Sequence, residues 1–141
     1  GLLRTITRAL LVFVALQVLL GAFVRHVGAG LSIPDFPLAM GRLVPPLDSP
    51  FVVLHFSHRV VAMIVVTLAI LASGVATTDL ESNRELGSIG RALAASTSVQ
   101  IALGAYVIWW QRDVLITVAH VVNGAAVFVL TVLLRNRVER G

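Results

Sequence analysis

The chain has 141 residues, of which 57% are apolar and only 13% are charged. A typical soluble domain carries about 25% charged residues, so this composition excludes an ordinary water-soluble globular protein. The formal net charge is +4, but the cations lie at the ends of apolar runs rather than on one basic face with interleaved aromatic residues, so nucleic acid is not an expected partner. Because these residues include no cysteine, they can form neither disulfides nor iron–sulfur clusters.

Four apolar runs are long enough to cross a bilayer as helices, since each span needs roughly 20 mainly apolar residues. The runs are about Ala9–Val24, Phe51–Ala76, Ala92–Trp110 and Val114–Leu134. The first run is short, but Arg4 and Arg8 can extend to the lipid headgroups. No small-residue cleavage site follows it, so we expect no cleavable signal peptide. The pattern predicts an all-α integral membrane protein with membrane lipid as a partner.

The arginines are divided unevenly between the two ends of these runs. Three of them lie on one side, called the outer side below: Arg25, Arg42 and Arg112. Seven lie on the side that also holds both termini: Arg4, Arg8, Arg84, Arg91, Arg135, Arg137 and Arg140. By the positive-inside rule, this bias predicts cytoplasmic termini for a multi-pass protein of the plasma membrane.

The connection between the first two runs differs from the other connections. It covers residues 25–50 and contains all five prolines of the chain. A loop of this length in a small protein is more often functional than a spacer. The alternative is a cap that only covers the outer end of the bundle.

The first and third runs share a short motif. QVLLGAFV at residues 17–24 and QIALGAYV at residues 100–107 are identical at five of eight positions. Two helical hairpins related by a pseudo-twofold axis along the membrane normal would explain this repeat. We therefore predict one domain, residues 1–141, that forms a four-transmembrane-helix bundle from two hairpins. Gln17 and Gln100 are expected to hydrogen-bond between helices, or else to line a ligand slot.

Two histidines from different runs fall at matching depths. The second and fourth runs both enter from the outer side, with His58 seven residues after Phe51 and His120 six residues after Val114. At 1.5 Å per residue, each imidazole lies roughly 9–11 Å below the outer boundary. Imidazoles that face each other across an apolar slot are typical axial ligands of haem iron. We therefore predict that His58 and His120 bind iron.

Three arginines are candidates for the two propionates of such a haem. Arg59 follows His58 directly, whereas Arg25 and Arg42 lie in the outer loop. Arginine pairs with carboxylates in a forked, charge-assisted geometry. We expect Arg59, together with Arg25 or Arg42, to hold the propionates.

Three other interpretations of the histidines stay open. They could hydrogen-bond between helices without a ligand, although ionisable groups inside a membrane usually mark function. His55, His58 and His120 could bind zinc, which accepts three imidazoles and a water. A proton relay is the third possibility, although no Asp or Glu lies within the apolar runs to continue it.

The segment GAFVRHVGAGLSIPDFPLAMG, residues 21–41, resembles the first outer segment of haem A synthases. In many members this segment reads close to G-x-x-V-R-x-T-x-S-G-L-S-C-P-D-W-P-x-C. The His-Arg pair in the second run and the lone histidine in the fourth are similar to that family too, and the resemblance covers the whole chain. It implies that His58 and His120 are haem ligands. Most members are eight-helix proteins of two fused halves, and this chain resembles one half, as in a compact archaeal form, which implies a homo-oligomer.

The resemblance also implies a reaction. Haem A synthases are membrane oxidoreductases that convert the C8 methyl group of haem O to a formyl group, which supplies haem A to terminal oxidases. Haem O would be the substrate and haem b an iron-containing cofactor, with haem O synthase or a terminal oxidase as possible protein partners. The alternative is a non-catalytic cytochrome b-type subunit that binds haem and transfers electrons.

Several residues depart from the family pattern. Ile33 and Ala39 stand near the positions of cysteines in many members, so no thiol chemistry carries over, and Phe36 replaces a tryptophan. His55 stands where the catalytic half often has the glutamate of Glu-x-x-His-Arg. A histidine can also transfer protons, so His55 is the candidate acid–base residue. The other interpretation is that this chain resembles the half that holds the cofactor.

Overall fold

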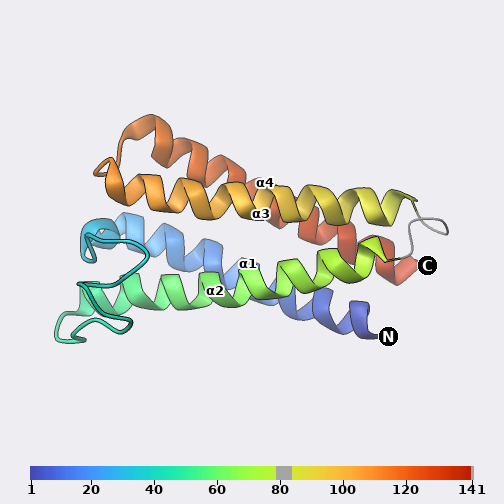
Figure 1. Cartoon of the computed structure of the whole chain (residues 1–141), viewed down its shortest axis with the longest axis horizontal. Coiled ribbons are helices and arrows are strands. Elements are labelled where there is room, and N and C mark those ends of the chain that lie inside the picture. The colour runs from blue at the N-terminus through green and yellow to red at the C-terminus, as the bar shows by residue number, and fades with distance from the viewer. Residues whose placement is uncertain (79–83, 141) are drawn as a thin grey trace.

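The computed structural model describes residues 1–78 and 84–140. These residues form four long α-helices, α1 (Leu2–His26), α2 (Pro50–Thr77), α3 (Arg84–Trp109) and α4 (Val114–Arg140), and a short 3-10 helix, η1 (Ala29–Leu31). The long helices run side by side along one axis, with both termini at one end and the loop between α1 and α2 at the other (Figure 1). All four are long and apolar enough to span a membrane. The prediction of an all-α, four-transmembrane-helix bundle is confirmed.

The helices are longer than the apolar runs, mainly at the end that holds the termini. There, α1 begins at Leu2 rather than Ala9, and α3 begins at Arg84 rather than Ala92. The extra turns are rich in arginine, which is a good helix former and can extend its charge to the headgroups. Hydropathy marks the hydrocarbon layer, whereas the helices continue beyond it.

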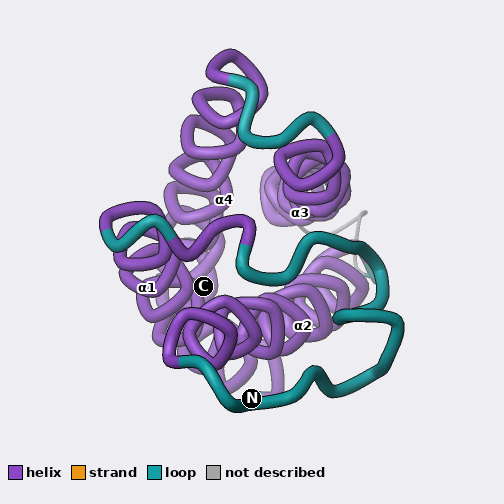
Figure 2. The backbone as a smooth tube through the Cα atoms, turned by 90° about the vertical axis from the view of Figure 1, so that its left-hand side faces the viewer, coloured by secondary structure: helices purple, strands orange, loops and turns teal. Residues whose placement is uncertain are grey.

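The helices pack in a ring, so that α1 and α3 lie on one diagonal and α2 and α4 on the other. Within the ring, α1 packs against α2 and α4, and α3 packs against the same two helices (Figure 2). The hairpins α1–α2 and α3–α4 therefore stand side by side, which agrees with the predicted pair of hairpins. A side chain from each of the four helices can reach the interior.

The apolar core fills the half of the bundle nearer the termini. Its buried members are Leu10, Val14, Val65, Ala69, Ala72, Ala76, Leu93, Val127 and Leu134. Here α2 and α3 approach closely, because a Cβ atom at Gly90 would lie 3.0 Å from the Cβ of Ala76. Small residues drive such close packing of membrane helices. Large apolar side chains such as Leu19 and Leu115 face outward and are 68% and 79% exposed, as expected for a surface in contact with lipid.

The outer loop has a defined turn at residues 35–42. The Asp35 carboxylate accepts hydrogen bonds from the N–H groups of Met40 and Gly41, at 2.6 and 2.8 Å. Met40 and Gly41 both have positive φ angles, and a bridge joins Ala39 to Arg42. The N–H groups of Gly41 and then Met40 lower the pKa of the Asp35 carboxyl below its ordinary value. Asp35 thus uses its charge to fix the turn.

Candidate functional site

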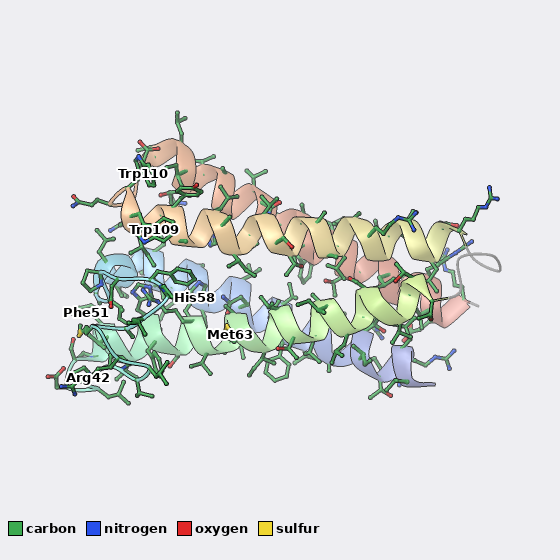
Figure 3. All side chains as sticks on the ribbon, in the orientation of Figure 1. Arg42, Phe51, His58, Met63, Trp109 and Trp110 are labelled. Carbon is green, nitrogen blue, oxygen red and sulfur yellow. The ribbon has the colours of Figure 1, made fainter. Side chains whose placement is uncertain are left out.

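Four polar side chains, one from each helix, meet inside the outer half of the bundle. In the first hairpin, Gln17 Nε2 lies 3.3 Å from His58 Nε2. In the second hairpin, Gln100 Nε2 lies 3.3 Å from His120 Nε2. The two imidazoles are close enough to interact electrostatically. His58 lies between the helices near the loop end of the bundle (Figure 3), and we call these four residues the polar interior.

Each imidazole also depends on a glycine one turn after the glutamine. A Cβ atom at Gly21 would lie 3.0 Å from Cε1 of His58, and a Cβ atom at Gly104 would lie 3.3 Å from Cε1 of His120. These separations are tighter than most real Cβ contacts, so a side chain at either position would require the ring to shift by a few tenths of an ångström. The repeat in the sequence therefore marks a Gln-x-x-x-Gly surface on α1 and on α3, against which a histidine of the same hairpin rests. The sequence showed the repeat but not its histidine partners.

The second hairpin has a further polar layer that the sequence did not reveal. Asn123 Nδ2 donates to the carbonyl oxygen of Ser96 at 2.9 Å and to Gln100 Oε1 at 2.7 Å. The Ser96 hydroxyl donates to Asn123 Oδ1 at 3.0 Å. Gln100 Nε2 also donates to the carbonyl oxygen of His120 at 3.0 Å. In the first hairpin, Gln17 Oε1 is buried without a hydrogen-bond partner among the described residues.

The polar partner of each Nε2 atom is the glutamine of its own hairpin rather than the other imidazole. The Nδ1 atoms of His58 and His120 are both buried and have no partner within residues 1–78 and 84–140. Two imidazoles inside an apolar bundle, each with only a glutamine amide at Nε2, fit the nitrogen donors that a haem iron takes from histidine. No group of three or more His, Cys, Asp or Glu side chains in the described ranges is arranged to hold a metal ion. The zinc interpretation, with His55 as a third ligand, thus has no support in this geometry.

His55 lies on α2 one turn before the polar interior, but it faces the outer loop. It is 5% exposed, and its Nε2 atom accepts a hydrogen bond from Arg59 Nε at 3.4 Å. Its Nδ1 atom lies 3.3 Å from the Ile33 backbone nitrogen, and the ring also hydrogen-bonds the Ala29 backbone. Both ring nitrogens therefore have partners in α2 or the outer loop.

Arg59 uses most of its donors to hold the loop. Its Nη1 atom donates to the Leu38 carbonyl oxygen at 2.9 Å. Its Nη2 atom donates to the carbonyl oxygens of Ile33 at 3.0 Å and Asp35 at 2.9 Å. Its guanidinium carbon lies 5.9 Å from the centre of the Phe36 ring. A cation at the membrane boundary is thereby satisfied by backbone dipoles, as intramembrane charges require.

The structure does not bring the other predicted arginines into this cluster. Arg25 and Arg42 are both exposed on the outer side, and Arg42 lies at the edge of the loop (Figure 3). His26, at the end of α1, is exposed as well. Of the predicted site residues, His58 and His120 meet in the polar interior, whereas His55 and Arg59 join α2 to the loop.

The aromatic residues at the outer end of α3 form a separate cluster. Tyr106 stacks edge-on against Trp109 and Trp110, with ring centres 5.6 and 5.0 Å apart. Phe36 reaches Trp109 from the loop, at 6.3 Å. A shallow groove of about 370 Å³ runs below them and is lined by Phe36, Ser98, Ile101, Ala102, Ala105, Tyr106 and Trp109. None of the polar interior lines this groove, so it is not the histidine site, and the exposed rings suit an interfacial aromatic belt.

Comparison with known proteins identifies the family. Residues 2–133 match the COX15-CtaA family, whose description is cytochrome oxidase assembly protein. The chain is 44% identical over 68 residues to a haem A synthase of Symbiobacterium thermophilum, covering 48% of this chain and 22% of that protein. It is 30% identical over 154 aligned positions to a haem A synthase of Methylobacterium radiotolerans, covering 99% of this chain and 41% of that protein. For a haem A synthase of Staphylococcus aureus, the identity is 29% over 118 residues, covering 84% of this chain and 38% of that protein.

In these alignments the chain spans less than half the length of the curated relatives it matches. No solved structure matches this chain. The family match nevertheless covers all four helices, except for the last residues of α4, and therefore includes the whole polar interior. The chain is a multi-pass membrane protein that belongs to the COX15-CtaA family of cytochrome oxidase assembly proteins, in agreement with its resemblance to haem A synthases.

Proposed function

We propose that this chain is a haem A synthase-like oxidoreductase that converts the C8 methyl group of haem O to a formyl group. Family membership supports a role in haem A biosynthesis. One observation carries the proposal for this chain: each hairpin directs a histidine, cradled by a glutamine and a glycine, into the outer half of an apolar bundle. The conversion removes four electrons and four protons and adds one oxygen, counted as water, so it requires an external electron acceptor.

In this proposal, His58 and His120 would hold haem b through its iron. Each Nε2 atom would exchange its glutamine amide for iron, which needs a neutral imidazole with a free lone pair. Bound haem would supply the one-electron and oxygen chemistry that amino-acid side chains lack. The protein would contribute orientation and exclusion of water, because the ligand residues lie within an apolar bundle rather than in a solvent-exposed loop.

For His55 we propose a positioning role in preference to acid–base catalysis. Both of its ring nitrogens have protein partners, which supports a link between α2 and the outer loop. The acid–base role that the family pattern implies would require the loop to release one nitrogen. Similarly, Arg59 would reach a propionate only with its remaining N–H or after the loop moves, whereas Arg25 and Arg42 are exposed cations on the outer side and are available for such a contact.

The remaining parts of the proposal concern location and partners. The excess of arginine at the end with the termini supports cytoplasmic termini in a plasma-membrane protein. A homo-oligomer, and contact with a haem O synthase or a terminal oxidase, rest on the family resemblance alone.

Expression beside a source of haem O, followed by pigment extraction and chromatography, tests the enzyme proposal. We expect hydroxylated and formyl haem from the wild-type protein, and neither from His58→Ala or His120→Ala. His26→Ala is the matched control, because His26 is an exposed histidine outside the polar interior, and it should retain the products. A folded wild-type preparation that contains haem O yet forms no modified haem would overturn the proposal.

A non-catalytic haem-binding subunit is the second candidate. It is favoured by the similarity of the two hairpins, since a Gln–Gly–His set from each hairpin would hold a haem. A carrier of this kind would contain haem b alone in a fixed ratio to protein. Pigment from the same preparations distinguishes the two functions, because only the enzyme accumulates modified haem.

A further inference from the structure

We infer that the two proposed iron ligands are not equivalent. A series of hydrogen bonds from Ser96 through Asn123 to Gln100, called the polar chain below, orients His120 for iron binding. His58 is the ligand that an incoming molecule displaces. The inference rests on the proposed haem site and assigns different roles to its two ligands. It follows from the different surroundings of two otherwise similar Gln–His pairs.

The polar chain begins at an atom whose role is unambiguous. The backbone carbonyl oxygen of Ser96 can only accept, so the Asn123 atom that lies 2.9 Å from it must be the amide nitrogen. The Ser96 hydroxyl, 3.0 Å from the other amide atom, is compatible with this orientation. Because the same Asn123 nitrogen donates to Gln100 at 2.7 Å, the facing atom of Gln100 is its oxygen. The orientation of both amides is therefore fixed by the network.

The chain ends at His120 and sets its tautomer. With its oxygen facing Asn123, Gln100 presents its nitrogen to the carbonyl oxygen of His120 at 3.0 Å and to His120 Nε2 at 3.3 Å. An N–H donor beside Nε2 makes that atom the acceptor, so the proton of the neutral ring is on Nδ1. This is the tautomer in which Nε2 can bind iron. Gly124 leaves room for the arrangement, since a Cβ atom there would lie 3.1 Å from the Gln100 nitrogen.

The first hairpin has no equivalent chain. The residues that follow His58 by three and four positions are Val61 and Ala62, where the second hairpin has Asn123 and Gly124. In the described part of the chain, the Gln17 oxygen is buried without a partner, and its nitrogen contacts only His58. Among the described residues, no carbonyl group fixes which atom of the Gln17 amide faces the ring. The His58 tautomer is therefore not determined by its surroundings.

Binding of iron would affect the two glutamines differently. If Nε2 of His120 leaves Gln100 for iron, Gln100 keeps its bonds to Asn123 and to the His120 backbone. If Nε2 of His58 leaves Gln17, the Gln17 nitrogen loses its partner as well as the buried oxygen, which is costly in an apolar environment. The difference corresponds to about 5- to 150-fold in ligand strength. His58 should therefore bind iron more weakly than His120 and be displaced first.

Carbon monoxide binding to the reduced, haem-loaded protein measures this displacement. We expect Gln17→Leu, which removes the stranded amide, to lower the affinity for carbon monoxide by about 5- to 150-fold. Asn123→Val, which copies the first hairpin, should raise the affinity, because Gln100 loses its anchor. Ser98→Ala changes an exposed hydroxyl on α3 outside the polar chain and should leave the affinity within about twofold. Equal affinities in the wild type and Gln17→Leu would overturn the inference.

Single-ligand variants give an independent measurement. We expect His58→Ala to retain haem on His120 and to regain a six-coordinate spectrum when imidazole is added, whereas His120→Ala should lose most of its haem. Equal haem retention in the two variants, or the reverse order, would contradict the inference.

A third measurement requires no substitution that could prevent folding. Nitrogen-15 NMR of the haem-free wild type, with labelled histidine, should show His120 with its proton on Nδ1. A proton on Nε2 would overturn the argument. A wild-type protein that never binds haem would refute the proposed function together with this inference. If haem binds but carbon monoxide affinity does not respond to Gln17→Leu, only the inference fails.

Discussion

Gly21 and Gly104 show how single residues shape the polar interior. Each lies one turn after a glutamine, and each leaves only enough space for the edge of an imidazole. Close packing around a membrane glycine commonly serves contact between backbones, but here the space is taken by a histidine side chain. A methyl group at either position would have to push the ring aside.

We predict that Gly21→Ala weakens haem binding through this displacement. An added Cβ would lie 3.0 Å from His58 Cε1, and overpacking of this kind costs about 1–3 kcal/mol. Haem content per protein and the visible spectrum check the prediction. Gly74→Ala is the control, because a Cβ atom there would meet nothing within 4 Å, and it should keep full haem content. Full haem content in Gly21→Ala would show that the ring does not depend on this glycine.

The depth of the histidines could be predicted from the sequence, because the rise per residue of a helix converts residue spacing into depth. His58 and His120 fall at matched depth for that reason. Their glutamine partners could not be predicted, because the pairing of Gln17 with His58 depends on how α1 and α2 are rotated about their axes. The role of Asn123 could not be predicted either, because it contacts Gln100 rather than a histidine. Residue type and spacing therefore indicated the ligands but not what orients them.

At the scale of elements, the main connection is between α2 and the outer loop. Arg59 donates to three loop carbonyl groups, and His55 bonds both Arg59 and the loop backbone. The sequence indicated a long, proline-rich loop at the outer end of the bundle. It did not predict that Arg59 donates hydrogen bonds to this loop. Every residue has a backbone carbonyl group, so the sequence does not show which of them accept.

We predict that Arg59→Lys loosens the loop, since an ammonium group cannot reproduce the fork of bonds to three carbonyl oxygens. Hydrogen bonds to charged groups contribute about 1.5–3 kcal/mol each, so the loss of even one should be measurable. Amide hydrogen exchange over residues 29–42 should rise by at least about tenfold. Arg91→Lys, an exposed arginine of α3 at the end that holds the termini, is the control. Unchanged exchange in Arg59→Lys would show that the loop holds its shape independently.

The turn at Asp35 should be sensitive to acid. The pKa of this carboxyl is lowered in the folded protein by the N–H groups of Gly41 and Met40, so the folded state binds fewer protons than the unfolded state. Its stabilising effect is present above the unfolded pKa of about 3.9 and is lost as the pH falls through the lower folded value. Pepsin cleavage within residues 35–42 should therefore increase only below about pH 4 in the wild type. In Asp35→Asn it should already be high at pH 5, and equal cleavage of the two proteins at pH 5 would contradict the assignment.

At the scale of the molecule, composition and hydropathy were sufficient for the fold. Four apolar runs gave four helices, and the repeat of QVLLGAFV as QIALGAYV indicated two similar hairpins. The helix ends near the termini were not predicted, because arginine-rich turns have no apolar signal. The repeat did not reveal that the two hairpins differ after their histidines. Three residues after the histidine, the first hairpin has Val61 and the second has Asn123.

The two halves of the bundle differ in the polarity of their interiors. Small and apolar residues pack the half near the termini, whereas the outer half holds histidines and glutamines beneath an anchored loop. Buried polar groups weaken packing unless they are paired, so a polar interior of this kind is expected to serve a ligand.

The optical spectrum of purified protein tests the central claim most directly. The account predicts a six-coordinate, low-spin haem in the wild type and in His26→Ala, and loss or weakening of that signature in both His58→Ala and His120→Ala. A colourless wild-type protein, or an unchanged spectrum in either of these two variants, would contradict it.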